Sequence, residues 1–174
     1  APINKKGINL AGFPHPGHTE FLAEYTQTTD FSLMMIGPNL RVVLVTNHIH
    51  LRKVSSLINK NLVARVIRLT HRWLSHFVTS SPKIAVTGLN PHCGEEGLFG
   101  EEERVSIRPA VLETEADGIG VTGPYPADSL FYEARNGSYD AVIAMYHDQG
   151  LTPVKMDSMG HAVNLTMGLP IVRT

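Results

Sequence analysis

Short runs of consecutive apolar residues recur along the chain and alternate with longer segments of helical character. The runs are SLMMI, RVVLVT, KIAVTG, GIGVTG and DAVIAM, at residues 32–36, 41–46, 83–88, 118–123 and 140–145. Consecutive apolar positions suit strands that are covered on both faces. Strands that alternate with helices predict an α/β domain, in which helices flank a layered, largely parallel sheet.

Three segments between or after these runs are predicted to be helical. Residues 62–77 are the clearest, because apolar residues recur there at three-to-four spacing and arginines fill the polar side. Residues 101–117 begin with acidic residues and are followed by a glycine, with Pro109 expected to kink the helix or to move its start. A third helix is expected after Asp128, which is predicted to be its N-cap, and an Asn-Gly pair is expected to end it.

Composition and charge restrict the class of protein. The 174 residues are 43% apolar and 18% charged, which is typical of a globular protein, and we expect residues 1–174 to form one domain. A formal net charge of −1 gives no reason to expect nucleic acid or an anionic membrane as a partner. No stretch approaches the roughly 20 apolar residues of a membrane span. The single cysteine, Cys93, excludes an internal disulfide and fits a reducing cytoplasm.

Both ends of the chain resemble cut ends. The chain starts without a methionine at APINK, which we interpret as the exit from a strand, and it stops at LPIVRT, an apolar, strand-like run. We therefore expect a piece of a longer chain.

Three of the strand-like runs each deliver a histidine within about four residues of their ends: His48, His92 and His147. Ligands bind outside the carboxyl ends of the strands in such sheets, and parallel strands bring those ends to one edge. Three neutral imidazoles form a common ligand set for divalent metals and leave positions open. Each histidine is otherwise a loop or hydrogen-bonded core residue. Asp148 offers a carboxylate to orient an imidazole, and Cys93 is either a soft ligand or a small buried residue.

A second group of residues suggests anion binding. A helix is expected to begin near Glu20, directly after His18 and Thr19, and a helix N-terminus favours a phosphate. The alternative is that Thr19 is only an N-cap. Spacing alone does not group three further polar residues that suit an anion, namely Lys155, Asn164 and Arg173. The glycine-rich residues 90–103 lack the spacing of a nucleotide-binding loop.

Several motifs together resemble the 4-hydroxythreonine-4-phosphate dehydrogenase family of pyridoxal phosphate biosynthesis, and they cover essentially the whole chain. They are PGHTEFLAE, LNPHCGEEGLFGEEE, PADSLF, AMYHDQGL and VNLTMGLPIVRT. The resemblance implies one domain of a two-domain α/β enzyme that is related in fold to isocitrate and isopropylmalate dehydrogenases. It also implies a cytoplasmic homodimer that uses a divalent metal and NAD or NADP. The implied reaction oxidises 4-phosphooxy-L-threonine to a 3-keto acid, which loses CO₂ to give 3-amino-2-oxopropyl phosphate.

The resemblance also implies roles for individual residues. A divalent metal is implied to be bound by His48, His92 and His147, and the last comes from the partner subunit. The sequence does not identify the metal, because three histidines admit zinc, cobalt, manganese or nickel and an oxygen-rich substrate admits magnesium. Asp128 and Asp148 match acidic residues near the metal. The positions that match substrate-binding residues are His18, Thr19, Lys155, Asn164 and Arg173. No residue is implied to bind the dinucleotide.

Other interpretations stay open at this stage. The sequence NHIHLR differs from the family's usual Thr-His-Leu-Pro-Leu-Arg and makes His50 a competing ligand. Two motifs that form much of the cofactor side of the family's cleft have no match, so we expect the chain to fold without catalysing turnover. The substrate is alternatively 4-phospho-erythronate or 4-phospho-threonate. A three-histidine metal hydrolase or phosphatase, with Asp148 as base, and a non-catalytic dimerisation module are further alternatives.

Overall fold

The central element of the fold is a mixed six-stranded sheet. The computed structural model describes residues 4, 7, 10–13, 15 and 18–173. The strand order is β4-β3-β5-β2-β1-β6. The first four of these strands run parallel to one another, whereas β1 is antiparallel to both β2 and β6. The strands are β1 Ser32–Ile36, β2 Arg41–Leu44, β3 Ile84–Thr87, β4 Val121–Tyr125, β5 Ala141–Ala144 and β6 Val163–Met167.

A tight turn explains why the sheet is mixed rather than parallel throughout. The amide of Gly37 donates to the carbonyl of Leu40 at 2.7 Å, so β1 and β2 form a hairpin. A connection this short can join only antiparallel strands, because a parallel pair needs a long crossover. The prediction of a largely parallel sheet is thus confirmed for β2 to β5 and wrong for β1 and β6.

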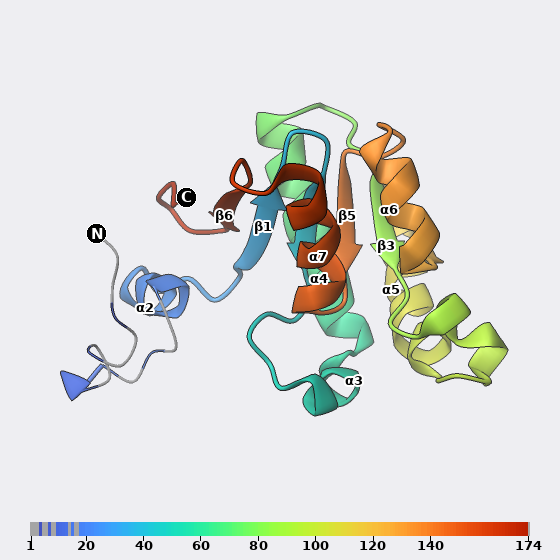
Figure 1. Cartoon of the computed structure of the whole chain (residues 1–174), viewed down its shortest axis with the longest axis horizontal. Coiled ribbons are helices and arrows are strands. Elements are labelled where there is room, and N and C mark those ends of the chain that lie inside the picture. Colours follow the sequence, from blue (N-terminus) through green and yellow to red (C-terminus); the bar gives the residue numbers. More distant parts are fainter. Residues whose placement is uncertain (1–3, 5–6, 8–9, 14, 16–17, 174) are drawn as a thin grey trace.

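Helices cover both faces of the sheet, as predicted for an α/β domain. Helix α7 lies in front of the sheet and α4 behind it in Figure 1. Neighbouring residues of one strand pack into opposite layers, with Val43 facing α4 and Val42 facing α7. This explains the continuous apolar runs in the sequence. The helices are α2 His18–Tyr25, α3 Val54–Leu57, α4 Lys60–Phe77, α5 Arg108–Ala116, α6 Ala127–Arg135 and α7 His147–Ser158, with short 3₁₀ or π segments at Leu51–Lys53, Pro91–Gly97 and Glu103–Ile107.

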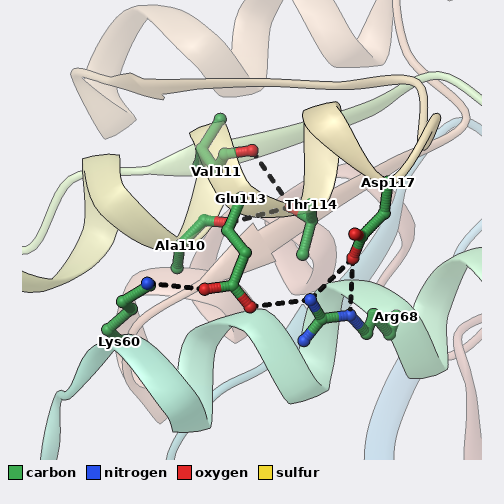
Figure 2. Close-up of polar contacts among 7 residues, drawn as sticks. All are labelled: Lys60, Arg68, Ala110, Val111, Glu113, Thr114 and Asp117. Carbon is green, nitrogen blue, oxygen red and sulfur yellow. Dashed lines mark hydrogen bonds and ion pairs between the residues drawn. The ribbon is translucent and has the colours of Figure 1, made fainter.

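An exposed network of charges joins α4 to α5 (Figure 2). Glu113 accepts from Lys60 at 2.6 Å and from Arg68 at 2.7 Å, and Arg68 also contacts Asp117 at 2.6 Å. The hydrogen bond from Lys60, followed by that from Arg68, holds the pKa of Glu113 below its usual value. Because such surface pairs contribute little energy singly, the network mainly aligns two helices that the apolar core already holds.

The structure moves the boundaries of two predicted elements. The prediction that Asp128 is an N-cap is wrong, because the carbonyl of Pro126 already accepts the helical bond from Leu130 at 3.1 Å. Asp128 lies in the first turn instead. The fourth strand begins only at Val121, since Gly118 has a φ of 85° and belongs to the turn that ends α5. Pro109 stands at the start of α5, which agrees with the prediction that this proline either kinks the helix or moves its start.

The C-terminal region differs more from expectation. Residues 169–173 of the strand-like LPIVRT do not form a strand, and β6 lies before them at Val163–Met167. Gly168, with a φ of 90°, turns the chain away, and Pro170 within the run has no amide to donate to a ladder. At the other end, the interpretation of APINK falls on residues of which only residue 4 is described. No helix in the described part of the chain is long and apolar enough to cross a bilayer.

Candidate metal and substrate site

Two of the predicted metal ligands meet at the carboxyl edge of the sheet. β2 and β5 are parallel neighbours, so their carboxyl ends lie together. His48 follows β2 by four residues, and His147 follows β5 and is the first residue of α7. Their ring centroids lie 5.5 Å apart, with 40° between the ring planes. The rule that strand ends converge therefore brings together two imidazoles that are far apart in the sequence.

A carboxylate contacts one of these imidazoles. Asp148 Oδ1 lies 2.6 Å from His147 Nδ1, which is the orienting contact that the sequence suggested. A neutral imidazole that donates from Nδ1 keeps the lone pair of Nε2 available for a metal. The side chain of His147 is 34% exposed and that of Asp148 is 84% exposed, so the pair is open to solvent and to ligands.

The separation of the His48 and His147 rings fits two ligands of one divalent metal ion. With metal–nitrogen distances of about 2.1 Å and a tetrahedral angle, two bound imidazoles have ring centres on the order of 5 Å apart. The ring centroids of His48 and His147 are separated by a similar distance, 5.5 Å. Within the described ranges, however, no three histidine, cysteine or carboxylate side chains gather into a metal-sized group. The described part of one chain thus brings together two of the three predicted ligands.

His92 lies apart from the pair. It is exposed in the turn Pro91–Gly97, where its ring centroid lies 6.4 Å from that of Phe99. This grouping differs from the one that the family resemblance implies, in which His147 belongs to the partner subunit. Next to His92, burial raises the pKa of the Cys93 thiol, and the charge of Glu103 adds to this effect. A thiol that stays protonated favours the interpretation of Cys93 as a packing residue.

Gln149 and Gly150 have structural roles that the sequence did not reveal. Gln149 Oε1 accepts from the amide of Met145 at 2.7 Å and from the hydroxyl of Thr87 at 3.0 Å. Gln149 Nε2 donates to the carbonyl of Gly88 at 2.8 Å. One amide side chain therefore ties the end of β5 to the end of β3. Gly150 then allows α7 to approach the sheet, because a Cβ there would lie 2.7 Å from Leu44 Cδ2.

Two of the predicted substrate-binding residues also meet. Arg173 Nη1 donates to Thr19 Oγ1 at 3.0 Å and to Thr166 Oγ1 at 3.2 Å. The predicted helix near Glu20 is confirmed as α2, which begins at His18. Thr19 therefore lies inside the helix, and the alternative in which it is only an N-cap is wrong. The side chain of His18 lies outside the described set.

The remaining candidates are placed separately. Asn164 lies in β6 with its Oδ1 buried and unbonded in the described structure, and Lys155 is exposed on α7. Asp128 Oδ1 accepts a hydrogen bond of 2.9 Å from the amide of Ser129, within its own helix. His50 Nδ1 accepts from the amide of Arg52 at 3.2 Å and caps a short 3₁₀ segment, which gives this competing ligand a local structural contact.

A cavity of about 510 Å³ extends from α2 to the edge of the sheet at His48. Glu20 of α2 lines it at one side, and Thr46, Asn47 and His48 line it beyond the end of β2. Arg65 also lines the cavity and is paired with Asp30 at 3.1 Å. The cavity therefore lies between α2, the helix that carries Thr19, and His48, and its volume suits a small metabolite.

Comparisons with known proteins agree over the whole chain. A family model described as pyridoxal phosphate biosynthetic protein PdxA matches residues 1–174. The 4-hydroxythreonine-4-phosphate dehydrogenase of Geobacter metallireducens is 49% identical over 174 residues, which are 100% of this chain and 51% of that protein. The D-threonate 4-phosphate dehydrogenase of Cupriavidus necator is 48% identical over 175 residues, which cover 100% of this chain and 53% of that protein.

A solved structure gives the same result for the fold. The crystal structure of 4-hydroxythreonine-4-phosphate dehydrogenase from Klebsiella pneumoniae superposes with a TM-score of 0.93 at 46% identity, covering 99% of this chain and 52% of that one. The chain thus spans about half the length of the curated relatives that it matches.

Proposed function

This chain belongs to the PdxA family of pyridoxal phosphate biosynthetic proteins, and on that premise we propose that it carries the metal- and substrate-binding part of an NAD- or NADP-dependent dehydrogenase. The proposed substrate is 4-phosphooxy-L-threonine, which is oxidised to a 3-keto acid. That acid loses CO₂ to give 3-amino-2-oxopropyl phosphate. The chain would form one domain of a two-domain enzyme related in fold to isocitrate and isopropylmalate dehydrogenases.

The observation that carries this proposal is the imidazole pair with its carboxylate. His48 and His147 have the separation of two ligands of one ion, and Asp148 directs the His147 ring. When bound, a divalent cation supplies Lewis-acid stabilisation for the charge that develops during alcohol oxidation and decarboxylation. Zinc, cobalt, manganese and magnesium are the candidate ions. Asp148 fixes the ring orientation, so that the pair does not have to reorganise during the reaction.

The phosphate of the substrate is proposed to bind near α2. Arg173 and Thr19 are already hydrogen-bonded to each other there, at 3.0 Å. A guanidinium, a hydroxyl and the first turn of a helix together suit a phosphate group. His18, Lys155 and Asn164 are proposed to complete the substrate contacts. Their proposed role is to orient the reacting carbon, and they take no part in the bond changes.

A second copy of the chain is proposed to complete the metal site. His92 does not join His48 and His147 within the described part of one chain. The large apolar side chains that follow it are exposed, Leu98 by 73% and Phe99 by 51%. Exposed apolar residues beside an isolated ligand suit a homodimer interface, across which His92 reaches the partner's pair. The active site would then be shared between two subunits.

One specific observation favours a second candidate substrate. The relatives named for D-threonate 4-phosphate are as similar to this chain as those named for 4-hydroxythreonine 4-phosphate, at 48% and 49% identity. The two acids differ at the carbon next to the carboxylate, which carries a hydroxyl in one and an amino group in the other. The fold, the metal and the dinucleotide would be the same for both.

Metal content measured together with the mass in solution tests the proposal. We expect about one divalent ion per chain in a dimer, lost in His147→Ala and retained in His76→Ala, which alters a histidine on α4. A wild-type protein that binds no divalent ion, or a His147→Ala variant that binds it unchanged, would contradict the proposal.

Calorimetry with each phosphorylated acid, in the presence of the metal, separates the two substrates. The tighter ligand identifies the substrate class.

A further inference from the structure

The turn that carries His92 has a strained backbone. Five successive residues have positive φ angles of 51°, 54°, 79°, 43° and 56°, from His92 to Glu96. Only Gly94 among them is a glycine. Each of the other four pays roughly 1–2 kcal/mol for the left-handed conformation. A left-handed segment of this length persists only if its surroundings hold it in place.

Glu103 is the group that holds this turn. Its side chain is 3% exposed. One carboxylate oxygen, Oε1, accepts from the amides of both Leu89 and Asn90 at 2.7 Å, and Oε2 accepts from Asn90 Nδ2 at 2.9 Å. The turn also folds closely over this carboxylate, since a Cβ on Gly94 would lie 2.8 Å from Oε2. The carboxylate thus fixes Leu89 and Asn90, which lie just before Pro91 and the left-handed segment.

Glu102 connects the same turn to the segment that follows His48. Asn90 Nδ2 donates to Glu102 Oε2 at 2.7 Å. The other carboxylate oxygen of Glu102 accepts from the hydroxyl of Ser55, in α3. The hydrogen bond from Ser55, and then that from Asn90, lowers the pKa of Glu102, which is therefore ionised at neutral pH. Asn90 is consequently held by two carboxylates at once, and its amide orientation is fixed.

We propose that Glu103, assisted by Glu102, is the positioning residue of His92: the buried carboxylate holds the left-handed turn and so presents the imidazole to the metal. This inference rests on the proposed function, in which His92 is a metal ligand. Glu103 does not touch the metal or the substrate in this proposal. It acts by keeping His92 in one place, which lowers the entropy cost of ligation.

Glu103→Gln tests the proposal without a change of size. The new amide can still accept from the backbone of Leu89 and Asn90, but its NH₂ faces the NH₂ of Asn90. Reversing the amide of Asn90 does not help, because its oxygen would then face Glu102. In Glu102→Gln/Glu103→Gln the Asn90 amide can reverse, since both new amides donate to its oxygen. The double variant should therefore recover what the single variant loses.

The experiment measures the zinc dissociation constant of the chain by calorimetry. We expect Glu103→Gln to weaken zinc binding by about 10–100-fold, the usual effect of losing a partner of a metal ligand. The double variant should recover most of this loss. Glu113→Gln is the matched control, because it removes a carboxylate from the α4–α5 surface network and should leave the constant within about two-fold. Hydrogen exchange of the Leu89 and Asn90 amides in metal-free protein should accelerate only in Glu103→Gln.

The outcomes separate this inference from the proposed function. Zinc binding by Glu103→Gln at the wild-type constant, or an equal loss in Glu113→Gln, would overturn the positioning role. His92→Ala must also lose affinity. If His92→Ala binds zinc like the wild type, or if the wild type binds none, the proposed function itself is wrong and the inference falls with it. Loss in His92→Ala without loss in Glu103→Gln overturns the inference alone.

Discussion

Replacement of Gln149 by alanine should loosen the two strand ends from which His92 and His147 depart. The side-chain amide of Gln149 makes three hydrogen bonds, to Thr87, Met145 and Gly88. Thr87 and Met145 are each 0% exposed. In Gln149→Ala the backbone amide of Met145, the hydroxyl of Thr87 and the carbonyl of Gly88 all lose these partners.

The magnitude follows from those three groups. A buried polar group without a partner costs about 1–3 kcal/mol. Water that enters the space left by the side chain would restore part of the bonding, so we take the lower bound for each group and expect a loss of about 3 kcal/mol. This is a large fraction of a total stability of roughly 5–15 kcal/mol. Urea unfolding, followed by circular dichroism, measures the loss directly.

Gln149→Glu provides the matched control. It keeps an acceptor for Met145 and Thr87 but places a second oxygen against the carbonyl of Gly88, so it should also be destabilised at neutral pH. Protonation gives the carboxyl a donor, and the deficit relative to the wild type should therefore shrink as the pH falls. If Gln149→Ala unfolds within about 1 kcal/mol of the wild type, these three bonds do not hold the strand ends.

Two further predictions concern α7. Gly150→Ala would place a Cβ 2.7 Å from Leu44 Cδ2 and 2.8 Å from Val42 Cγ1, and should lower the free energy of unfolding by about 1–3 kcal/mol; unchanged urea unfolding would contradict this packing. The hydrogen bond from Arg135 lowers the pKa of Asp157 in the folded protein. The ionised carboxylate therefore stabilises the fold at pH values above its unfolded pKa, and this stabilisation is lost as the pH falls through its folded pKa. Asp157→Asn should therefore be less stable than the wild type at neutral pH and equal to it in acid, and a constant difference across a pH series of unfolding curves would refute this.

The sequence was sufficient to predict features that depend on local pattern and on one topological rule. Strands such as β5 were predicted because their apolar residues are consecutive, as burial on both faces requires. The approach of His48 to His147 followed from the convergence of parallel strand ends. The helix α7 was not predicted. Its residues look like a polar motif followed by Pro153. Its buried positions recur at helical spacing, but two of them are Gly150 and Ser158, so the apolar pattern in the sequence is weak.

Other features could not be predicted because distant residues decide them. The direction of β1 depends on the turn closed by Gly37, and its pairing with β6 joins segments far apart in the chain. The turn at His92 is similar, because no local signal predicts a left-handed conformation for four residues other than glycine. The conformation depends on Glu103, which follows His92 by eleven positions. Such a contact becomes visible only in the folded structure.

The two parts of the proposed metal site therefore depend on different supports. His147 is oriented by its neighbour Asp148 and by the first turn of α7, while His92 depends on a carboxylate from a separate segment. A change at Glu103 should consequently disturb His92 and leave the pair of His48 and His147 intact. Two imidazoles still bind zinc, although more weakly than three. Glu103→Gln keeps all three imidazoles and should thus weaken zinc binding less than His147→Ala, which removes one of them.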